Sequence, residues 1–90
     1  MRTEFDPAKR LATLEARGLD MADADLLFEG ATLTVADDRR DYGEVRNIRI
    51  GHLHERMVVL VWTSRGNRRR IISMRKANGK EQALYGPRLG

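Results

Sequence analysis

The chain contains no cysteine, so disulfide bonds and metal sites built on thiolate ligands are excluded. Long apolar runs are also missing, since no stretch approaches the ~20 residues that a membrane-spanning helix needs. The first ten residues, MRTEFDPAKR, lack the apolar segment of a signal peptide. We therefore expect a soluble, cytoplasmic protein with no membrane segment.

The chain is also short. Its 90 residues are expected to form a single domain, residues 1–90, because domains begin at about 50 residues. With 41% hydrophobic residues it can bury a core, but a domain of this size is only marginally stable alone. A partner that binds only the folded state would stabilise it.

Charge is abundant and unevenly distributed. Residues 1–45 carry 6 Lys and Arg against 11 Asp and Glu, whereas residues 46–90 carry 11 against 2. Within the second half, the segment RRRIISMRK at 68–76 places five cations together without an acid. Such a surface attracts polyphosphate, so nucleic acid is the leading candidate partner.

Three helices are predicted. The Asp-Pro pair at 6–7 is typical of a helix start, and Gly18 is a natural stop. A second helical pattern opens at Asp20 and ends at Gly30. Residues 77–85 are expected to form a last helix.

Four strands are predicted at residues 32–35, 45–51, 57–64 and 69–74. The third is apolar on both faces, which is typical of a central, covered strand. The glycine in the turn Arg-Gly-Asn at 65–67 favours a tight hairpin between the last two. The predicted fold class is therefore α+β, with two N-terminal helices, a four-stranded antiparallel sheet and a C-terminal helix.

Several motifs resemble one known family when they are read in series. They are EFDPAK at 4–9, DYGEVRNIRIG at 41–51, VVLVWTSRG at 58–66 and RRIISMRKAN at 69–78, followed by Glu81 and Tyr85. This series is similar to the BrnT toxins of bacterial type II toxin–antitoxin systems, roughly from Glu4 to Tyr85. The chain departs from the family pattern at Phe5, where Trp is usual, at Val45, where Glu is usual, and at Asn47, where an aromatic residue is usual.

The resemblance implies a RelE-like fold and an endoribonuclease that cuts RNA to arrest growth, with no metal and no other cofactor. It also implies a BrnA-like antitoxin that carries a ribbon-helix-helix region and represses the operon. Operator DNA would then be bound only through the antitoxin, in a 2:2 heterotetramer.

Cleaving RNA requires the 2′-hydroxyl to lose its proton and the negative charge that develops on phosphorus to be stabilised. This chain is rich in arginine, whose planar fork matches phosphate, and poor in histidine. We expect Arg46, Arg70 and Arg75 to be the catalytic cations that contact phosphate. Glu44 is expected to orient an arginine or to accept a proton.

The spacing of these arginines sets a condition. Arg70 and Arg75 are an odd number of residues apart, so in a regular strand they point to opposite faces. They can converge only if Arg75 lies beyond the strand or a bulge intervenes. The other interpretation is that these cations are solvated charges that protect an edge strand from pairing.

Further RNA contacts are expected from Arg68, Arg69, Lys76 and Tyr85. Tyr85 could stack on a base, or it could anchor the last helix to the sheet. Glu81 could position an arginine, or it could pair with Lys80 or Arg88 on an exposed helix face.

Trp62 is expected in the core. His52 and His54 are interpreted as surface residues near a hairpin connection, and no third ligand at suitable spacing supports a metal site there.

Three function classes remain open on these grounds. The first is the endoribonuclease toxin, and the second is a non-catalytic module that binds nucleic acid or an antitoxin. The third is an interaction protein whose basic face binds an acidic partner.

Overall fold

The computed structural model describes residues 2–29, 32–36 and 43–89. The helix end expected at Gly30 and the polar residues 37–41, which follow the first predicted strand, lie outside the described residues.

The sheet has five strands rather than the four predicted. They are β1 (Arg2–Glu4), β2 (Thr32–Ala36), β3 (Asn47–Leu53), β4 (Arg56–Arg65) and β5 (Arg68–Lys76), in the order β1-β5-β4-β3-β2. β2 to β5 form the expected antiparallel meander, but β1 pairs parallel to β5, so the sheet is mixed. The prediction missed β1 because three residues are too few to show an alternating pattern.

The helical elements are α1 (Pro7–Arg17), the 3-10 helix η1 (Met21–Phe28) and α2 (Gly79–Leu89). The predicted start and stop of α1 are confirmed: the Asp6 side chain accepts a hydrogen bond from the Ala8 N–H, and Gly18 adopts a left-handed conformation at φ 68°. Asp20 likewise caps η1 by accepting from the Ala22 N–H.

Two helix predictions need correction. The second helix is a 3-10 helix, and its buried residues Met21, Ala24 and Leu27 recur at the three-residue period of that conformation. The last helix spans Gly79–Leu89 rather than 77–85. It begins after Asn78 because the Asn78 side chain accepts from the Glu81 N–H while Glu81 accepts from the Asn78 N–H.

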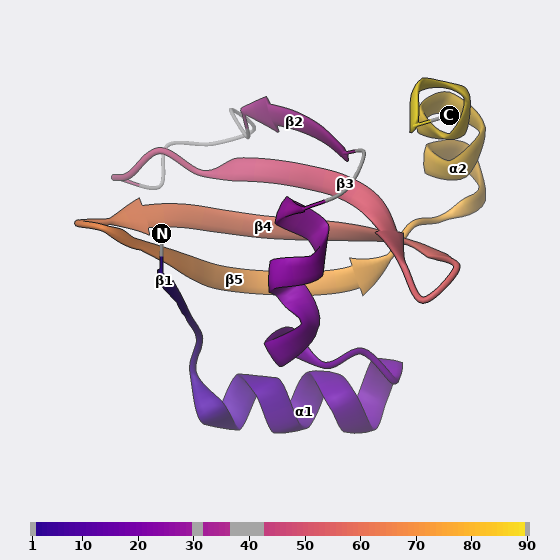
Figure 1. Ribbon diagram of the computed structural model, residues 1–90. Helices are drawn as coiled ribbons and strands as arrows, with labels where there is room; N and C mark the ends of the chain where they lie inside the picture. The colour runs from indigo at the N-terminus through magenta and orange to yellow at the C-terminus, as the bar shows by residue number, and fades with distance from the viewer. Residues whose placement is uncertain (1, 30–31, 37–42, 90) are drawn as a thin grey trace.

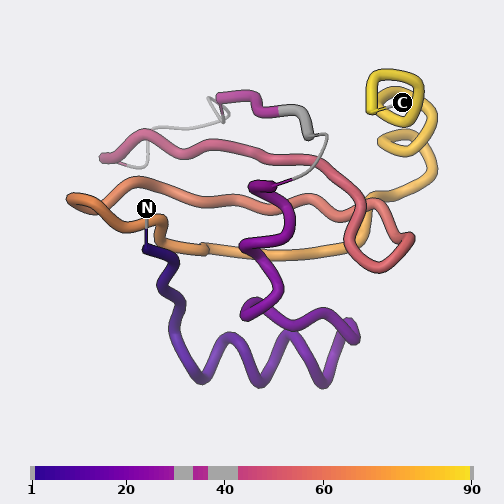
Figure 2. Tube along the Cα trace, viewed as in Figure 1, coloured from indigo at the N-terminus to yellow at the C-terminus, as the bar shows by residue number. Residues whose placement is uncertain are grey.

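The helices leave the two faces of the sheet unequally covered (Figure 1). We call the side against η1 the first face; it buries Leu60, Ile71 and Met74 against residues of η1. The second face carries a smaller cluster that includes Ile50 and Val59, with α2 packed on it. Figure 2 shows β1 near the β4–β5 hairpin and α2 at the other end of the sheet, so the second face near that hairpin lies away from α2.

A bulge interrupts β5 at Ile72. Val61 pairs with Ser73 but Trp62 pairs with Ile71, which leaves Ile72 as an extra residue. Because the bulge shifts the alternation by one, Arg70 and Arg75 lie on the same face: their partners Thr63 and Val59 are four residues apart in β4. The bulge that the sequence required for these two arginines to share a face is therefore present.

No helix in the part of the chain that the structure describes is long and apolar enough to cross a membrane.

Candidate functional site

Cationic side chains from four segments line a pocket of about 150 Å³ near the β4–β5 hairpin. Its lining residues are Asp6, Lys9, Glu44, Arg46, Arg65, Arg70, Ile71 and Ile72, and we call it the cationic pocket. Strand pairing places the side chains of Arg65 and Arg70 on the second face. Arg46 precedes β3, and its neighbour Val45 is fixed beside β4 because the buried Thr63 hydroxyl donates to the Val45 carbonyl at 2.6 Å.

Cations outnumber carboxylates among the described residues that line the pocket. It holds four cations and two carboxylates. Glu44 lies between two of the cations, with Oε1 3.5 Å from Arg46 Nε and Oε2 3.8 Å from Arg65 Nη2. Arg70 Nη1 is 3.9 Å from Glu4 Oε1. Among the residues that the structure describes, the four cations of the pocket outnumber these carboxylates, so their summed charge is positive and can attract an anion.

Three of the four predicted catalytic residues therefore meet in one place, and the fourth does not. Arg46, Arg70 and Glu44 line the cationic pocket, whereas Arg75 does not line it. Arg75 donates two hydrogen bonds to Glu81, from Nη1 at 2.7 Å and from Nη2 at 2.8 Å. Arg75 thus shares a face with Arg70 but is bound to the start of α2.

The structure pairs Glu81 with Arg75 rather than with Lys80 or Arg88. These hydrogen bonds from Arg75 are the main reason that the pKa of Glu81 falls to about 2. The Asn78 N–H lowers that pKa further, and burial opposes both effects. Glu81 therefore joins Arg75 to the N-terminus of α2.

The predicted RNA-binding residues are divided between the two faces. Arg68 pairs with Arg65 across the hairpin and contacts Glu4 at 3.1 Å. Arg69 lies on the first face, where its guanidinium is 3.8 Å from the centroid of the Phe28 ring. Lys76 pairs with Val58, a residue of the first-face core, and so points to that face as well.

Tyr85 is partly buried against the cluster on the second face. This position agrees with the interpretation that it anchors the last helix.

Trp62 packs against the first-face core, with its ring edge-on to Phe28 at a centroid distance of 5.4 Å. His52 is exposed, and His54 lies in the β3–β4 turn with Nε2 3.4 Å from Asp23 Oδ2. Neither histidine lines the cationic pocket.

Sequence reasoning gave no role to two cations of the pocket. The sequence places Arg65 in a turn, but it ends β4, and its side chain lies on the same face as Thr63, the residue that pairs with Arg70. Lys9 belongs to the EFDPAK motif, and the parallel pairing of β1 with β5 brings the start of α1 to the pocket. The face on which Arg65 lies could have been predicted from the sequence, because Arg65 is two residues from Thr63 along the strand. The position of Lys9 depends on a strand pairing that the sequence does not reveal.

An α+β domain that gathers arginines in a partly open pocket has the features of a protein that binds phosphate groups. Comparison with known families narrows this class. A family model for the ribonuclease toxin, BrnT, of type II toxin–antitoxin systems matches residues 5–81.

The match covers most of the chain, so the chain belongs to this family, and the resemblance inferred from the motifs is confirmed. The protein is therefore a member of a family of ribonuclease toxins whose partner is a protein antitoxin. The comparison with curated proteins finds none that matches the chain.

Proposed function

We propose that this protein is an endoribonuclease that cuts RNA in the cationic pocket without a metal ion or other cofactor, and so arrests growth until an antitoxin binds. The observation that carries the proposal is the convergence of Arg46, Arg65 and Arg70 with Glu44 in one pocket of a BrnT-family chain.

The pocket supplies two of the functions that this reaction needs, charge stabilisation and a proton acceptor. The ribose 2′-oxygen attacks the adjacent phosphorus, the bond to the leaving 5′-oxygen breaks, and a 2′,3′-cyclic phosphate forms. Arg46, Arg65 and Arg70 stabilise the charge that develops on the phosphoryl oxygens. Glu44 lies between Arg46 and Arg65, so it orients both guanidiniums and is the carboxylate that takes the 2′-hydroxyl proton. The leaving oxygen takes a proton from solvent, which reaches the half-exposed side chain of Arg65.

The remaining predicted contacts extend this site. Arg68 pairs with the pocket residue Arg65 across the hairpin, and it contacts a neighbouring phosphate. Arg75 lies further along the second face and contacts RNA away from the cleaved bond. Arg69 and Lys76 point to the first face, and we leave them out of the RNA path.

The antitoxin that we propose is BrnA-like, with a ribbon-helix-helix region that binds operator DNA and represses the operon. We further propose that the complex is a 2:2 heterotetramer that acts in the cytoplasm. Light scattering on the co-purified complex gives its mass, and a 1:1 complex would refute the proposed stoichiometry.

The proposed function is tested by producing the chain alone in bacteria and by incubating the purified protein with RNA. We expect slowed growth, and RNA cleavage that persists when EDTA removes divalent metals. Arg46→Ala and Arg70→Ala should each reduce the cleavage rate by about 10²-fold or more, the effect of removing one charge-stabilising donor.

Arg56→Ala is the matched control, because Arg56 is exposed at the start of β4 and does not line the pocket. It should cleave at the wild-type rate. Arg70→Ala protein that is folded by circular dichroism and still fully active would refute the assigned site. Wild-type protein that binds RNA without cutting it would instead make the chain a non-catalytic nucleic-acid-binding module.

A further inference from the structure

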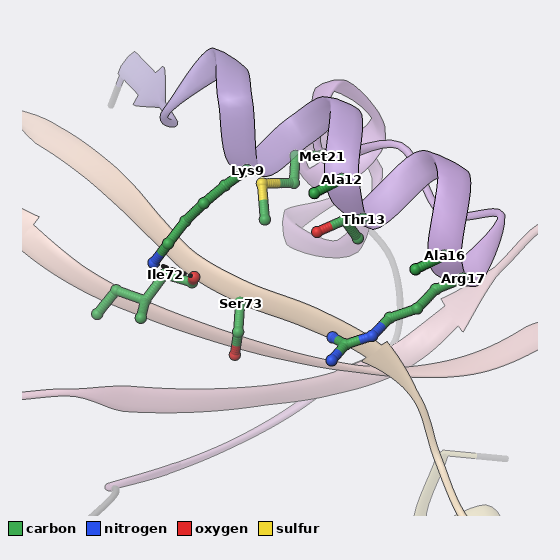
Figure 3. Close-up of a pocket in the computed structure, with 8 residues that line it drawn as sticks. All are labelled: Lys9, Ala12, Thr13, Ala16, Arg17, Met21, Ile72 and Ser73. Carbon is green, nitrogen blue, oxygen red and sulfur yellow. Dashed lines mark hydrogen bonds between the residues drawn. The ribbon is translucent and has the colours of Figure 1, made fainter.

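A second hollow, of about 330 Å³, lies between α1 and β5. Figure 3 shows the side chains that line it: Lys9, Ala12, Thr13, Ala16, Arg17, Met21, Ile72 and Ser73. We call it the α1–β5 hollow. Its volume is at the lower end of the range for small-molecule pockets, about 300–1,000 Å³.

The hollow exists because α1 does not pack tightly against the sheet. β1 pairs with β5 only as far as Arg70, and beyond that residue the same edge of β5 has no strand beside it among the residues that the structure describes. α1 runs past this edge but buries none of its own residues. The α1 residues that face the gap include the small Ala12 and Ala16, which leave it open (Figure 3).

Two cations bridge the hollow at its ends. Lys9 Nζ donates to the Ile72 carbonyl at 3.4 Å, and Arg17 Nη1 donates to the Met74 carbonyl at 2.8 Å. They are eight residues apart in α1, so about 12 Å of helix separates them. The other polar lining residues are the hydroxyl-bearing Thr13 and Ser73, and none of the described residues that line the hollow carries a carboxylate. The lining therefore suits an anionic ligand that also has an apolar part.

The α1–β5 hollow adjoins the cationic pocket. Lys9 and Ile72 line both spaces, so the bulge residue and one lysine mark the boundary between them. A ligand that places one phosphate among Arg46, Arg65 and Arg70 can continue along β5 past Lys9 towards Arg17.

We propose that the α1–β5 hollow is a nucleotide subsite for the RNA chain. The nucleotide next to the phosphate in the cationic pocket places its base against Ala12, Ala16 and Met21. Its own phosphate is bound by Arg17. This inference rests on the proposed function, because it takes the ligand of the cationic pocket to be RNA.

The same contacts argue against an extended peptide as the occupant. A strand that added to β5 would need the main-chain carbonyls of Ile72 and Met74 as hydrogen-bond acceptors. Those carbonyls already accept from Lys9 and Arg17, an arrangement that protects the strand edge from pairing. RNA does not need the main-chain carbonyls of β5 as acceptors, because it would bind through the cations and the apolar side chains that line the hollow.

The first test measures the salt dependence of binding to a fluorescent oligouridylate whose 2′-O-methyl groups prevent cleavage. Each phosphate contact in a single strand contributes about 0.7 to the slope of log K against log salt. Arg17→Met should reduce that slope by about 0.7. Arg56→Met removes the same charge near the same end of α1, where the Arg56 guanidinium approaches Gly18, and should leave the slope unchanged. Arg17→Lys should retain the wild-type slope, which separates the loss of a phosphate contact from a loss of folding.

The second test fills the hollow. Ala16→Leu should weaken binding of the oligonucleotide about tenfold, because the base loses its contacts in the hollow. Ala8→Leu adds the same side chain at an exposed position of α1 that does not line the hollow, and it should bind as wild type does. Both variants are checked by thermal unfolding.

The outcomes separate the two proposals. If Arg70→Ala abolishes cleavage while Arg17→Met and Ala16→Leu match their controls, the subsite is wrong and the proposed function stands. If Arg70→Ala cleaves normally, the catalytic site assigned to the cationic pocket is wrong, and the slope of Arg17→Met still decides whether nucleic acid binds in the hollow. If Ala16→Leu binds RNA normally but no longer co-purifies with antitoxin, the hollow is an antitoxin site and the subsite is refuted.

Discussion

Two arginines of β5 are held by carboxylates in different ways. Arg75 makes two short hydrogen bonds to Glu81, whereas Arg70 Nη1 is 3.9 Å from Glu4. A phosphate that bound Arg75 in the same bidentate manner would have to displace Glu81 first. Arg70 requires no such exchange, which makes it the stronger candidate for the first phosphate contact.

The ion pair between Arg75 and Glu81 predicts an acid-sensitive stability. The folded protein lowers the pKa of Glu81 from 4.5 to about 2. The stabilisation is therefore fully present above the unfolded pKa of 4.5 and is lost as the pH falls towards 2. Glu81→Gln keeps a side chain that can cap α2 but removes the charge. We expect it to lower the free energy of unfolding at neutral pH by about 1 kcal/mol, a value reduced for the partial exposure of the pair.

Denaturant unfolding at a series of pH values between neutral and about 3 checks this prediction. The difference between wild type and Glu81→Gln should narrow as the pH falls through this range. Asp20 also has a pKa of about 2, mainly because Arg10 donates to it, so part of the acid response should remain in the variant. A constant difference at all pH values would show that the ion pair does not contribute.

At the scale of elements, two glycines should respond oppositely to alanine. Gly18 ends α1 at φ 68°, a left-handed conformation that costs a residue with a Cβ about 1 kcal/mol. Gly79 begins α2 without a positive φ, and an added Cβ there meets nothing within 4 Å.

Gly18→Ala should therefore lower the free energy of unfolding by about 1 kcal/mol, and Gly79→Ala should raise it by about 0.4–1 kcal/mol. Thermal unfolding of the two variants side by side measures both signs. A stabilising Gly18→Ala would mean that the helix ends elsewhere in solution.

Elements with strong local signals were predicted well from the sequence. The caps at Asp6, Gly18 and Asp20 and the hairpin glycine Gly66, at φ 62°, all lie where the pattern placed them, because each depends on a few adjacent residues. The sequence did not predict the bulge at Ile72 itself; it showed only that Arg70 and Arg75 could share a face if a bulge lay between them. The bulge depends on the register between two strands, which no local pattern determines.

The part of the candidate site that lies on or next to the antiparallel strands β3, β4 and β5 was predictable from the sequence. Arg46, Glu44 and Arg70 were chosen from the sequence, and the antiparallel order of β3, β4 and β5 brings them to one pocket. The sequence assigns Asp6 and Lys9 no role in the site, because they reach the pocket through the parallel pairing of β1 with β5. That contact joins residues 2–4 to residues 68–70, far apart in the sequence, and no local pattern marks it.

At the scale of the whole molecule, the uneven charge of the sequence becomes a difference between surfaces. Acids of the first half, such as Asp20, Asp23 and Asp25, lie in or beside η1 against the first face. The second face near the hairpin carries Arg65, Arg70 and the rest of the cationic pocket. An RNA strand would therefore be drawn to the second face near the hairpin.

This arrangement predicts that the antitoxin and RNA exclude each other. An antitoxin that silences the enzyme by covering the cationic pocket must occupy the surface that binds the substrate phosphate. Adding the purified cognate antitoxin to the complex with the uncleavable oligonucleotide should lower the fluorescence anisotropy to that of free RNA. Because RNA binding depends on released counterions, added salt should weaken the RNA complex more than the antitoxin complex. A ternary complex of toxin, antitoxin and RNA would show that the antitoxin inhibits from a surface other than the pocket.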